Sequence, residues 1–308
     1  MSGQNNHGHT PHLSVIQGDG VPSVEQIVGA RTLNGKRGLI LGMGLGGIAQ
    51  GCLAVLSAFG ASTAVAAINQ KVLGKCEEFI DKHEFNVPAF LTCDVSKPGD
   101  VDILFSSLRS ATRWESLDFV IFSVAGAPKD EIKKPLKEAT REGLTMALEI
   151  SAFPLIELAR NCEEMMTQGG TVISLGYLGE ERVVEGYDLM APVKAFLRTS
   201  MLYLAAELGP KNIRFHDVSP GPIPTRAASG LPGFNRLVES SETSGMLPGH
   251  VNIYDVGHMV AFLVSDAALH MTAETIHVDL GTHAMGLSQD HGSEAGSAEE
   301  SSQAAKLA

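Results

Sequence analysis

Seven short apolar runs alternate along this chain with longer amphipathic stretches, and this alternation constrains the fold more than any other feature. Each run is bounded by glycine, proline or polar residues, as buried strands commonly are. The stretches between the runs are long enough to form helices that cross from one strand to the next. The predicted strands are Gly38–Leu41, Ser62–Ala67, Ala89–Thr92, Phe119–Ser123, Thr171–Leu175, Ile213–Ser219 and Glu274–Val278.

Several of the intervening stretches are predicted to form crossover helices. Strand, helix and strand repeated in this order indicate a parallel sheet covered by helices on both faces. Right-handed crossovers then give an α/β, doubly wound, Rossmann-type fold. Examples of the predicted helices are Ile48–Phe59, Asp100–Arg113, Phe196–Leu208 and Ile253–Val264.

We expect one domain over residues 31–287, because no internal repeat and no second domain is visible. Residues 1–30 are rich in Gly, His, Asn and Pro, and residues 288–308 contain no aromatic or β-branched side chain. Such segments cannot bury enough apolar surface to offset the entropy of ordering, so both are expected to be disordered tails. Histidines in the first tail could bind a metal ion, but a flexible tail is the preferred interpretation. They are His7, His9 and His12.

Composition narrows the class of protein. Hydrophobic residues make up 44% of the chain, which allows a large core, and the net charge of -12 disfavours a nucleic-acid partner. No apolar run reaches the ~18 residues that span a bilayer, and no signal peptide is visible, so a cytoplasmic location is expected. No CxxC pair is present, so we predict no disulfide framework and no thiolate metal site. The four cysteines are expected to be buried: Cys52, Cys76, Cys93 and Cys162.

A glycine-rich turn follows the first predicted strand. Residues 42–49 read Gly-Met-Gly-Leu-Gly-Gly-Ile-Ala and lead into a predicted helix. Glycine lets the backbone approach a pyrophosphate, and the helix N-terminus offers free N–H groups and positive potential. The turn therefore predicts a dinucleotide site, and a merely structural turn is the alternative.

Two further strand ends carry candidate cofactor contacts. Asp94 follows the third predicted strand, where its carboxylate could accept a hydrogen bond from an adenine amino group. The alternative is that Asp94 caps the following helix. Small residues at 123–128, after the fourth strand, would let a cofactor lie over the strand ends.

The chemistry is predicted to come from a tyrosine and a lysine after the fifth strand. Tyr187 and Lys194 are seven residues apart, and two helical turns span about 7.2 residues, so both side chains are expected on one helix face. An ammonium group near a phenol stabilises the phenolate and can also hold a ribose hydroxyl.

Together these features resemble the short-chain dehydrogenase/reductase superfamily and, within it, the enoyl-acyl-carrier-protein reductases. These reductases carry Tyr-x6-Lys with another tyrosine ten residues upstream, as Tyr177, Tyr187 and Lys194 do here, in place of the more common Tyr-x3-Lys. The resemblance covers residues 34–287. Further matches are Gly176-Tyr177-Leu178-Gly179-x-Glu181-Arg182, Thr140-Arg141-Glu142-Gly143, Gly221-Pro222-Ile223-x-Thr225-x-Ala227-Ala228-Ser229-Gly230 and His277-Val278-Asp279.

The resemblance implies roles for individual residues. Tyr177, Tyr187 and Lys194 would be catalytic, with Tyr187 stabilising the enolate that forms when hydride reaches the β-carbon of the substrate. Ala127 and Tyr177 would lie beside the substrate, and no metal is implied. The residues implied to contact the cofactor are Gly42, Gly47, Ile48, Asp94, Val95, Ala125, Lys194 and Ile223.

The chain departs from the family pattern at several positions. The glycine turn is one residue shorter than usual, Gly176 stands where a serine is usual, and Ile68 stands where a polar residue is often found. Pro192 lies between the predicted catalytic tyrosine and lysine. Because proline is well tolerated only in the first turn of a helix, we expect the helix to begin close to Pro192 or to bend there.

The leading hypothesis is an NAD(P)H-dependent reductase of 2,3-unsaturated acyl thioesters, carried on acyl carrier protein or coenzyme A, in fatty-acid biosynthesis. The family favours NADH, and NADPH stays open because no acidic residue follows the second strand and Lys71 is a weak 2′-phosphate candidate. The alternatives are a related short-chain reductase acting on another activated alkene or carbonyl, and a non-catalytic nucleotide-binding paralogue. A homotetramer is expected, through apolar faces of Phe196–Leu208 and of a helix around Leu144–Leu158.

Overall fold

A computed structural model describes residues 28–29, 32–225, 237–238 and 245–286. Most of the two predicted tails, residues 1–30 and 288–308, lies outside the described residues, and their disorder stays a prediction. The same holds for the end of the motif that begins at Gly221, since residues 226–230 are not described.

The described strands form one seven-stranded sheet in which every pair of neighbours is parallel. Their order is β3-β2-β1-β4-β5-β6-β7, so the chain moves outward from β1 to β3 and then starts again on the other side of β1. The predicted Rossmann-type fold is confirmed, and each predicted strand is found to within one residue. The strands are β1 Arg37–Leu41, β2 Ser62–Ala67, β3 Phe90–Thr92, β4 Phe119–Phe122, β5 Gly170–Leu175, β6 Ile213–Pro220 and β7 Glu274–Val278.

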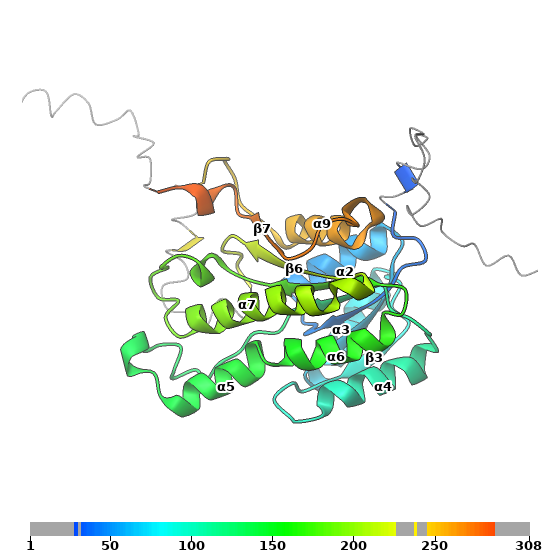
Figure 1. The fold of residues 1–308 in the computed structure, drawn as a ribbon, viewed down its shortest axis with the longest axis horizontal. Helices are drawn as coiled ribbons and strands as arrows, with labels where there is room; N and C mark the ends of the chain where they lie inside the picture. Colours follow the sequence, from blue (N-terminus) through cyan, green and yellow to red (C-terminus); the bar gives the residue numbers. More distant parts are fainter. Residues whose placement is uncertain (1–27, 30–31, 226–236, 239–244, 287–308) are drawn as a thin grey trace, which may run out of the picture.

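Helices cover both faces of this sheet (Figure 1). One face packs against α2, α3 and α9, and the other against α4, α5, α6 and α7. Short 3₁₀ turns complete the connections. The helices are α2 Ile48–Ala58, α3 Gln70–Lys82, α4 Asp100–Thr112, α5 Arg141–Ser151, α6 Pro154–Met165, α7 Met190–Leu208 and α9 Ile253–Val264, and the 3₁₀ turns are η2 Leu136–Glu138, η3 Leu178–Glu180, η4 Gly209–Lys211, η6 Asp266–Ala268 and η7 Thr282–Ala284.

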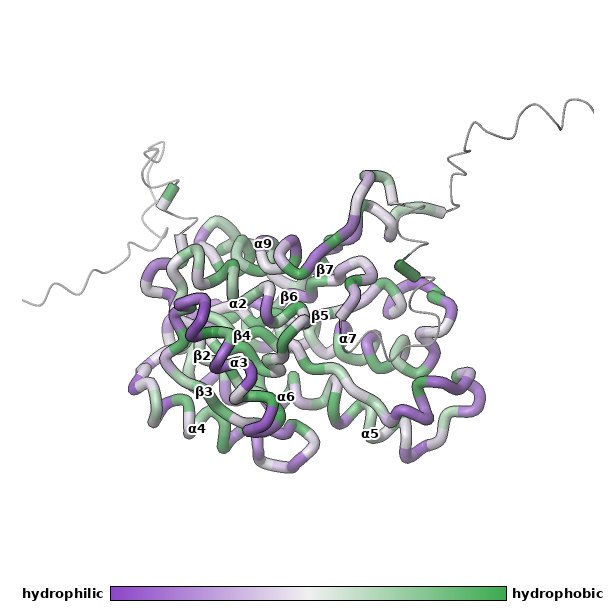
Figure 2. Tube along the Cα trace, turned by 180° about the vertical axis from the view of Figure 1, so that it is seen from behind, coloured by the Kyte–Doolittle hydropathy of each residue, from purple (hydrophilic) through white to green (hydrophobic). Residues whose placement is uncertain are grey.

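The sheet separates two apolar cores. Successive strand residues point to opposite faces, so Leu39 and Leu41 join the core under α4–α7, whereas Ile40 joins the core under α2, α3 and α9. The hydropathy colouring in Figure 2 shows apolar residues along the strands and polar residues mainly on the outer loops. The four cysteines are buried as predicted.

One stretch that was predicted to be a single helix forms two helices. The stretch around Leu144–Leu158 was expected to be continuous, but α5 ends at Ser151 and α6 begins at Pro154. Proline lacks the N–H that a helix interior needs and suits a first turn, so the chain ends one helix and begins the next there. Among the described residues, no helix combines the length and the apolar character that a membrane span requires.

Two glycines let α2 and α9 pack closely. A Cβ added at Gly51 would collide with the backbone of Ile253, and one added at Gly257 would lie 2.6 Å from the carbonyl oxygen of Gly51. Neither contact can be relieved by turning a flexible side chain. The helix that begins at the glycine-rich turn is therefore held against the sheet by a neighbour that tolerates no added methyl group.

We therefore expect Gly257→Ala to lower the free energy of unfolding by about 1–3 kcal/mol, since the extra methyl group forces the two backbones apart. Urea unfolding measures this change. Gly74→Ala on α3 is the matched control, because nothing lies within 4 Å of its added Cβ, and it should raise stability by ~0.5 kcal/mol. Equal stability of Gly257→Ala and the wild-type chain would contradict the close contact.

Candidate active site

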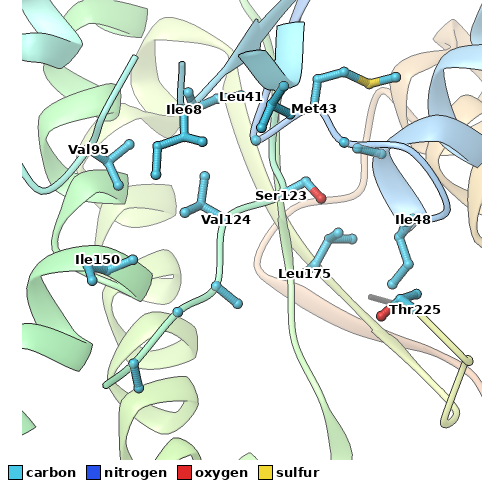
Figure 3. A pocket seen from close by; sticks show the side chains of 18 of the residues that line it. Leu41, Met43, Ile48, Ile68, Val95, Ser123, Val124, Ile150, Leu175 and Thr225 are labelled. Carbon is cyan, nitrogen blue, oxygen red and sulfur yellow. The ribbon is translucent and has the colours of Figure 1, made fainter. Parts of the chain in front are cut away.

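A cavity of about 940 Å³ opens at the carboxyl edge of the sheet. It lies where the strand order reverses between β1 and β4, the place where open α/β sheets bind ligands. Loops that follow six of the strands contribute to its wall, from the β1–α2 turn to the residues after β6. Most of the side chains labelled in Figure 3 are apolar.

The structure brings every predicted site residue to this one cavity. Residues from the glycine turn and from the ends of β3, β4, β5 and β6 all contribute to its lining, so segments far apart in sequence meet there. Their individual roles stay predictions. The predicted residues that line the cavity are Gly42, Gly47, Ile48, Asp94, Val95, Ala125, Ala127, Tyr177, Tyr187, Lys194 and Ile223.

The glycine turn has the conformation that an anion site needs. Gly42 has φ of 98° and Gly46 has φ of 72°, in the left-handed region that glycine adopts without strain. A Cβ at Gly42 would strike the backbone of Ser123 at the end of β4. Helix α2 follows with Gly47 as its N-cap, without a side-chain cap and without an acidic residue in its first turn. Its N-terminal amides are thus available to a negatively charged group.

Asp94 lines the cavity and does not cap the next helix. Its carboxylate accepts hydrogen bonds from the hydroxyl of Ser96 at 2.6 Å and from the backbone N–H of Ser96. The N-cap of α4 is Gly99. The Ser96 hydroxyl is the main cause that lowers the pKa of Asp94, with the nearby ammonium of Lys97 adding to it. Asp94 is therefore fixed as a charged acceptor on the cavity wall.

The loop after β4 is tied to α5 by one buried hydroxyl. The Oγ of Ser151 accepts a hydrogen bond from the N–H of Gly126 at 2.8 Å and donates one to its carbonyl oxygen at 2.7 Å. Ser151 is fully buried. Both backbone groups of Gly126 are thereby satisfied, and Ala125 and Ala127 on either side are held at the cavity.

The two tyrosines lie against each other. The ring centroids of Tyr177 and Tyr187 are 4.6 Å apart, with 54° between the ring planes. Tyr187 also packs on Gly179, where an added Cβ would meet its ring. Tyr187 is buried and Tyr177 is partly buried. Both rings therefore form one part of the cavity lining, with Tyr177 the more exposed of the two.

The helix that carries Lys194 begins later than the seven-residue spacing suggested. Helix α7 starts at Met190, so Tyr187 lies in the turn before it, and the chain reverses at Asp188, whose φ is 28°. The prediction that both side chains share a helix face was wrong. The alternative based on Pro192 is confirmed, because Pro192 occupies the first turn of α7.

The Tyr187 phenol is held in its protonated form. Burial is the main cause that raises its pKa, and Tyr177, Glu180 and Asp217 raise it further. Burial also raises the pKa of Tyr177, to about 12. We expected Lys194 to favour the phenolate, but the desolvation of the ring outweighs any such effect. Both tyrosines are hydrogen-bond donors at neutral pH.

Comparison with known proteins now decides the family. The family model described as enoyl-(acyl carrier protein) reductase matches residues 44–283. The protein named enoyl-[acyl-carrier-protein] reductase [NADH] FabI of Escherichia coli is 34% identical over 251 residues, which cover 81% of this chain and 94% of that protein. This chain belongs to the enoyl-acyl-carrier-protein reductase family.

Solved structures of this reductase family share the fold. The Anaplasma phagocytophilum reductase in complex with NAD has a TM-score of 0.77 and 32% identity, with 83% of this chain and 97% of that chain covered. The Bacillus cereus reductase with NADP+ and indole naphthyridinone has a TM-score of 0.79 and 33% identity, with 83% of this chain and 99% of that chain covered.

Sequence reasoning missed two residues beside the site of this family member. Carboxyl oxygens of Glu180, in η3, and of Asp217, in β6, both lie within 3 Å of the position that a Cβ on Gly176 would occupy. Gly176, where the family usually has serine, leaves room for both carboxyls, because an added Cβ would force their ends to shift. An ionisable residue inside an apolar strand run was the signal that could have identified Asp217.

The part of the cavity lined by residues after β2 carries two lysines. Asn69 caps α3 by accepting a hydrogen bond from the N–H of Val72, and it lines the cavity together with Ile68 and two lysines. Asp94, at the end of β3, is the one carboxylate among the described lining residues. The lysines are Lys71 and Lys75.

We expect Ser151→Ala to lower the free energy of unfolding by about 1–3 kcal/mol, because it leaves the N–H and carbonyl of Gly126 without their partner. Urea unfolding measures the loss. Ser106→Ala on α4 is the control, since that hydroxyl bonds a helix carbonyl on an exposed face. It should change stability by less than about 0.5 kcal/mol. A Ser151→Ala chain as stable as the control would contradict the proposed support of the loop.

Proposed function

We propose that this chain is an NADH-dependent enoyl-acyl-carrier-protein reductase that reduces the 2,3-double bond of an acyl thioester in fatty-acid biosynthesis. The observation that carries the proposal is the meeting of Tyr177, Tyr187 and Lys194 with the glycine turn in one cavity. Its family membership supports the same reaction. A non-catalytic paralogue would have no need to keep both tyrosines and the lysine at the cavity.

The cavity fits a nicotinamide dinucleotide. The uncapped N-terminus of α2 suits a pyrophosphate, and Asp94 suits an amino group of the adenine. A reduced nicotinamide bound in this cavity supplies a hydride to the β-carbon of the substrate. The residues proposed to hold the cofactor are Gly42, Gly47, Ile48, Asp94, Val95, Ala125, Lys194 and Ile223.

The chain itself stabilises the charge that reduction creates. As the β-carbon becomes bonded to hydrogen, negative charge grows on the thioester oxygen. Tyr187 is protonated and buried, so its O–H can donate to that oxygen in a site of low polarity, where such a bond is strong. The ammonium of Lys194, also buried, adds positive potential at the same wall. Tyr177 is proposed to contact the thioester at its edge.

The apolar part of the wall is proposed to take the acyl chain. Ala127, Ile132, Ile150 and Met190 line the cavity beyond the tyrosines, where they exclude water from the reacting atoms. The acyl group is proposed to arrive on acyl carrier protein, with coenzyme A as the second carrier. We propose the cytoplasm as the location.

One observation favours NADPH as a second cofactor. Lys71 and Lys75 line the cavity after β2, and the described residues of that segment include no carboxylate that would oppose a 2′-phosphate. Side-by-side titration with NADH and NADPH therefore belongs to the first experiment.

The wild-type chain should oxidise NADH when a crotonyl thioester is added, as absorbance of the reduced cofactor records. Tyr187→Phe removes a hydrogen bond that strengthens as charge develops, so turnover should fall about a hundredfold while cofactor affinity barely changes. Lys194→Ala should lower cofactor affinity and turnover together, because it removes a proposed ribose contact and a charge.

Tyr254→Phe is the matched control, since Tyr254 is exposed on α9 and is not part of the cavity lining, and it should keep wild-type rates. Wild-type turnover by Tyr187→Phe would overturn the mechanism. Cofactor binding without oxidation by any enoyl thioester would favour a different alkene or carbonyl substrate. Binding of neither cofactor would favour the non-catalytic alternative.

We also propose that the chain forms a homotetramer. Large apolar side chains are exposed on α5 and α7 and in the link between α5 and α6, which is unusual for a surface facing only water. Light scattering at micromolar concentration should give four times the mass of the chain, and a monomer would contradict the proposal. The exposed side chains are Met146, Phe153, Phe196 and Tyr203.

A further inference from the structure

A pair of buried carboxyl groups lies directly behind the cavity wall. Glu180 has a side chain that is 1% exposed, and Asp217 is completely buried. Both approach Gly176, whose neighbours Leu175 and Tyr177 line the cavity. Neither carboxyl belongs to the cavity lining. They can therefore act on the reaction only through the residues between them and the cavity.

The hydrogen bonds of this pair require a proton. Ser174 donates its hydroxyl to Oδ1 of Asp217. Among the described residues, Oδ2 of Asp217 and Oε1 of Glu180 have no donor. Oδ2 of Asp217 and Oε2 of Glu180 both lie beside the Cβ position that Gly176 leaves empty, so the two carboxyl groups are neighbours. A hydrogen bond between them can form only if one is protonated. Since two adjacent buried carboxylates repel each other and lose hydration, one proton stays on the pair.

Lys194 is the buried cation near this pair, held beside Gly176 by its bond to the preceding residue. Its ammonium is buried and donates to the carbonyl oxygen of Leu175. Burial lowers the pKa of Lys194, and the charges of Asp217 and Glu180 oppose that effect. A pair with one proton carries one negative charge, which balances one ammonium. Without it, Lys194 would be an uncompensated charge in the wall of the site.

We propose that Glu180 and Asp217 share one proton and act as a positioning pair that keeps Lys194 charged at the cofactor side of the cavity. The proposal rests on the proposed function only for the role of Lys194, whereas the shared proton is a property of the chain itself. Ser174 donates a short hydrogen bond to Asp217. In the part of the chain that is described, Glu180 accepts only a long one, from the N–H of Tyr177 at 3.4 Å, so the negative charge belongs on Asp217 and the proton on Glu180.

Other charged groups near the pair do not replace Lys194. Arg198 Nε lies 3.8 Å from Oε1 of Glu180, but this Nε donates to the hydroxyl of Thr275. The Nη2 of Arg198 pairs with Glu181 at 3.2 Å, and Arg198 is also partly exposed. Burial raises the pKa of both Glu180 and Asp217. The remaining titratable groups around the pair are Tyr177 and Tyr187 on the cavity side and His277 on β7, which lies 4.0 Å from Glu181.

The shared proton is tested by unfolding, without cofactor or substrate. Glu180 takes up a proton on folding at neutral pH, because its pKa is raised above the unfolded value. The free energy of unfolding therefore falls as pH rises from the pKa of Glu180 in the unfolded chain to its pKa in the folded chain. Relative to Glu180→Gln, the wild-type unfolding constant should increase by up to about tenfold per pH unit in this interval.

Urea unfolding of both chains between about pH 5 and pH 8 measures this difference. Glu181→Gln is the matched control, as this neighbouring carboxylate is partly exposed and already paired with Arg198, and it should keep the wild-type dependence. Parallel curves for the wild-type and Glu180→Gln chains would overturn the shared proton. If Glu180→Gln does not fold, Asp217→Asn is compared in the same way, since it also leaves one carboxyl.

The effect on Lys194 is tested by NADH binding, followed by fluorescence from pH 6 to pH 9. Each single variant keeps one ionisable carboxyl and should bind within about threefold of the wild type. The double variant Glu180→Gln/Asp217→Asn keeps none, so its affinity should fall by about tenfold or more, and further at high pH as Lys194 deprotonates.

A double variant with the wild-type pH profile would overturn the action on Lys194. Two independent packing defects would instead give losses that multiply and do not depend on pH. If the wild-type chain binds neither NADH nor NADPH, the proposed function fails, and the unfolding measurement still decides whether the proton is shared.

Discussion

The contact on which the site depends is the backbone approach of Gly42 to Ser123, at the point where the sheet reverses its strand order. Strand β1 pairs with β2 on one side and with β4 on the other. The chain continues from β1 toward β2 and from β4 toward β5, in opposite directions along the sheet, so a crevice opens between the ends of β1 and β4. Only glycine fits at position 42, because a Cβ would enter the backbone of Ser123. That close approach aims the N-terminus of α2 into the cavity, and the packing of Gly51 against α9 holds it there.

The fold was accessible from sequence because its signal is local and repeated. Buried parallel strands are short apolar runs, and the helices between them need only amphipathic length, so boundaries such as Ser62–Ala67 and Ile253–Val264 were predicted without error. The helix break before Pro154 and the start of α7 at Met190 were harder. There a proline decides where a helix begins, and spacing alone extends the pattern beyond that point.

The sequence predicted which residues meet at the site better than it predicted their protonation states. Glycine, aspartate and tyrosine after successive strands must meet at one edge of a parallel sheet, and they do. The charge state of Tyr187 depends on how far its ring is buried, which no spacing reveals. Desolvation disfavours the charged form of every group. Burial therefore raises the pKa of the Tyr187 phenol and lowers the pKa of Lys194.

Glu180, Asp217 and Gly176 form a coupled set that a single position cannot explain. A side chain at 176 would force the ends of both carboxyls to move, and either carboxyl alone in this buried place would lack the partner that shares its proton. The glycine is thus the space that two acids require, and the acids supply the negative charge that a buried lysine requires.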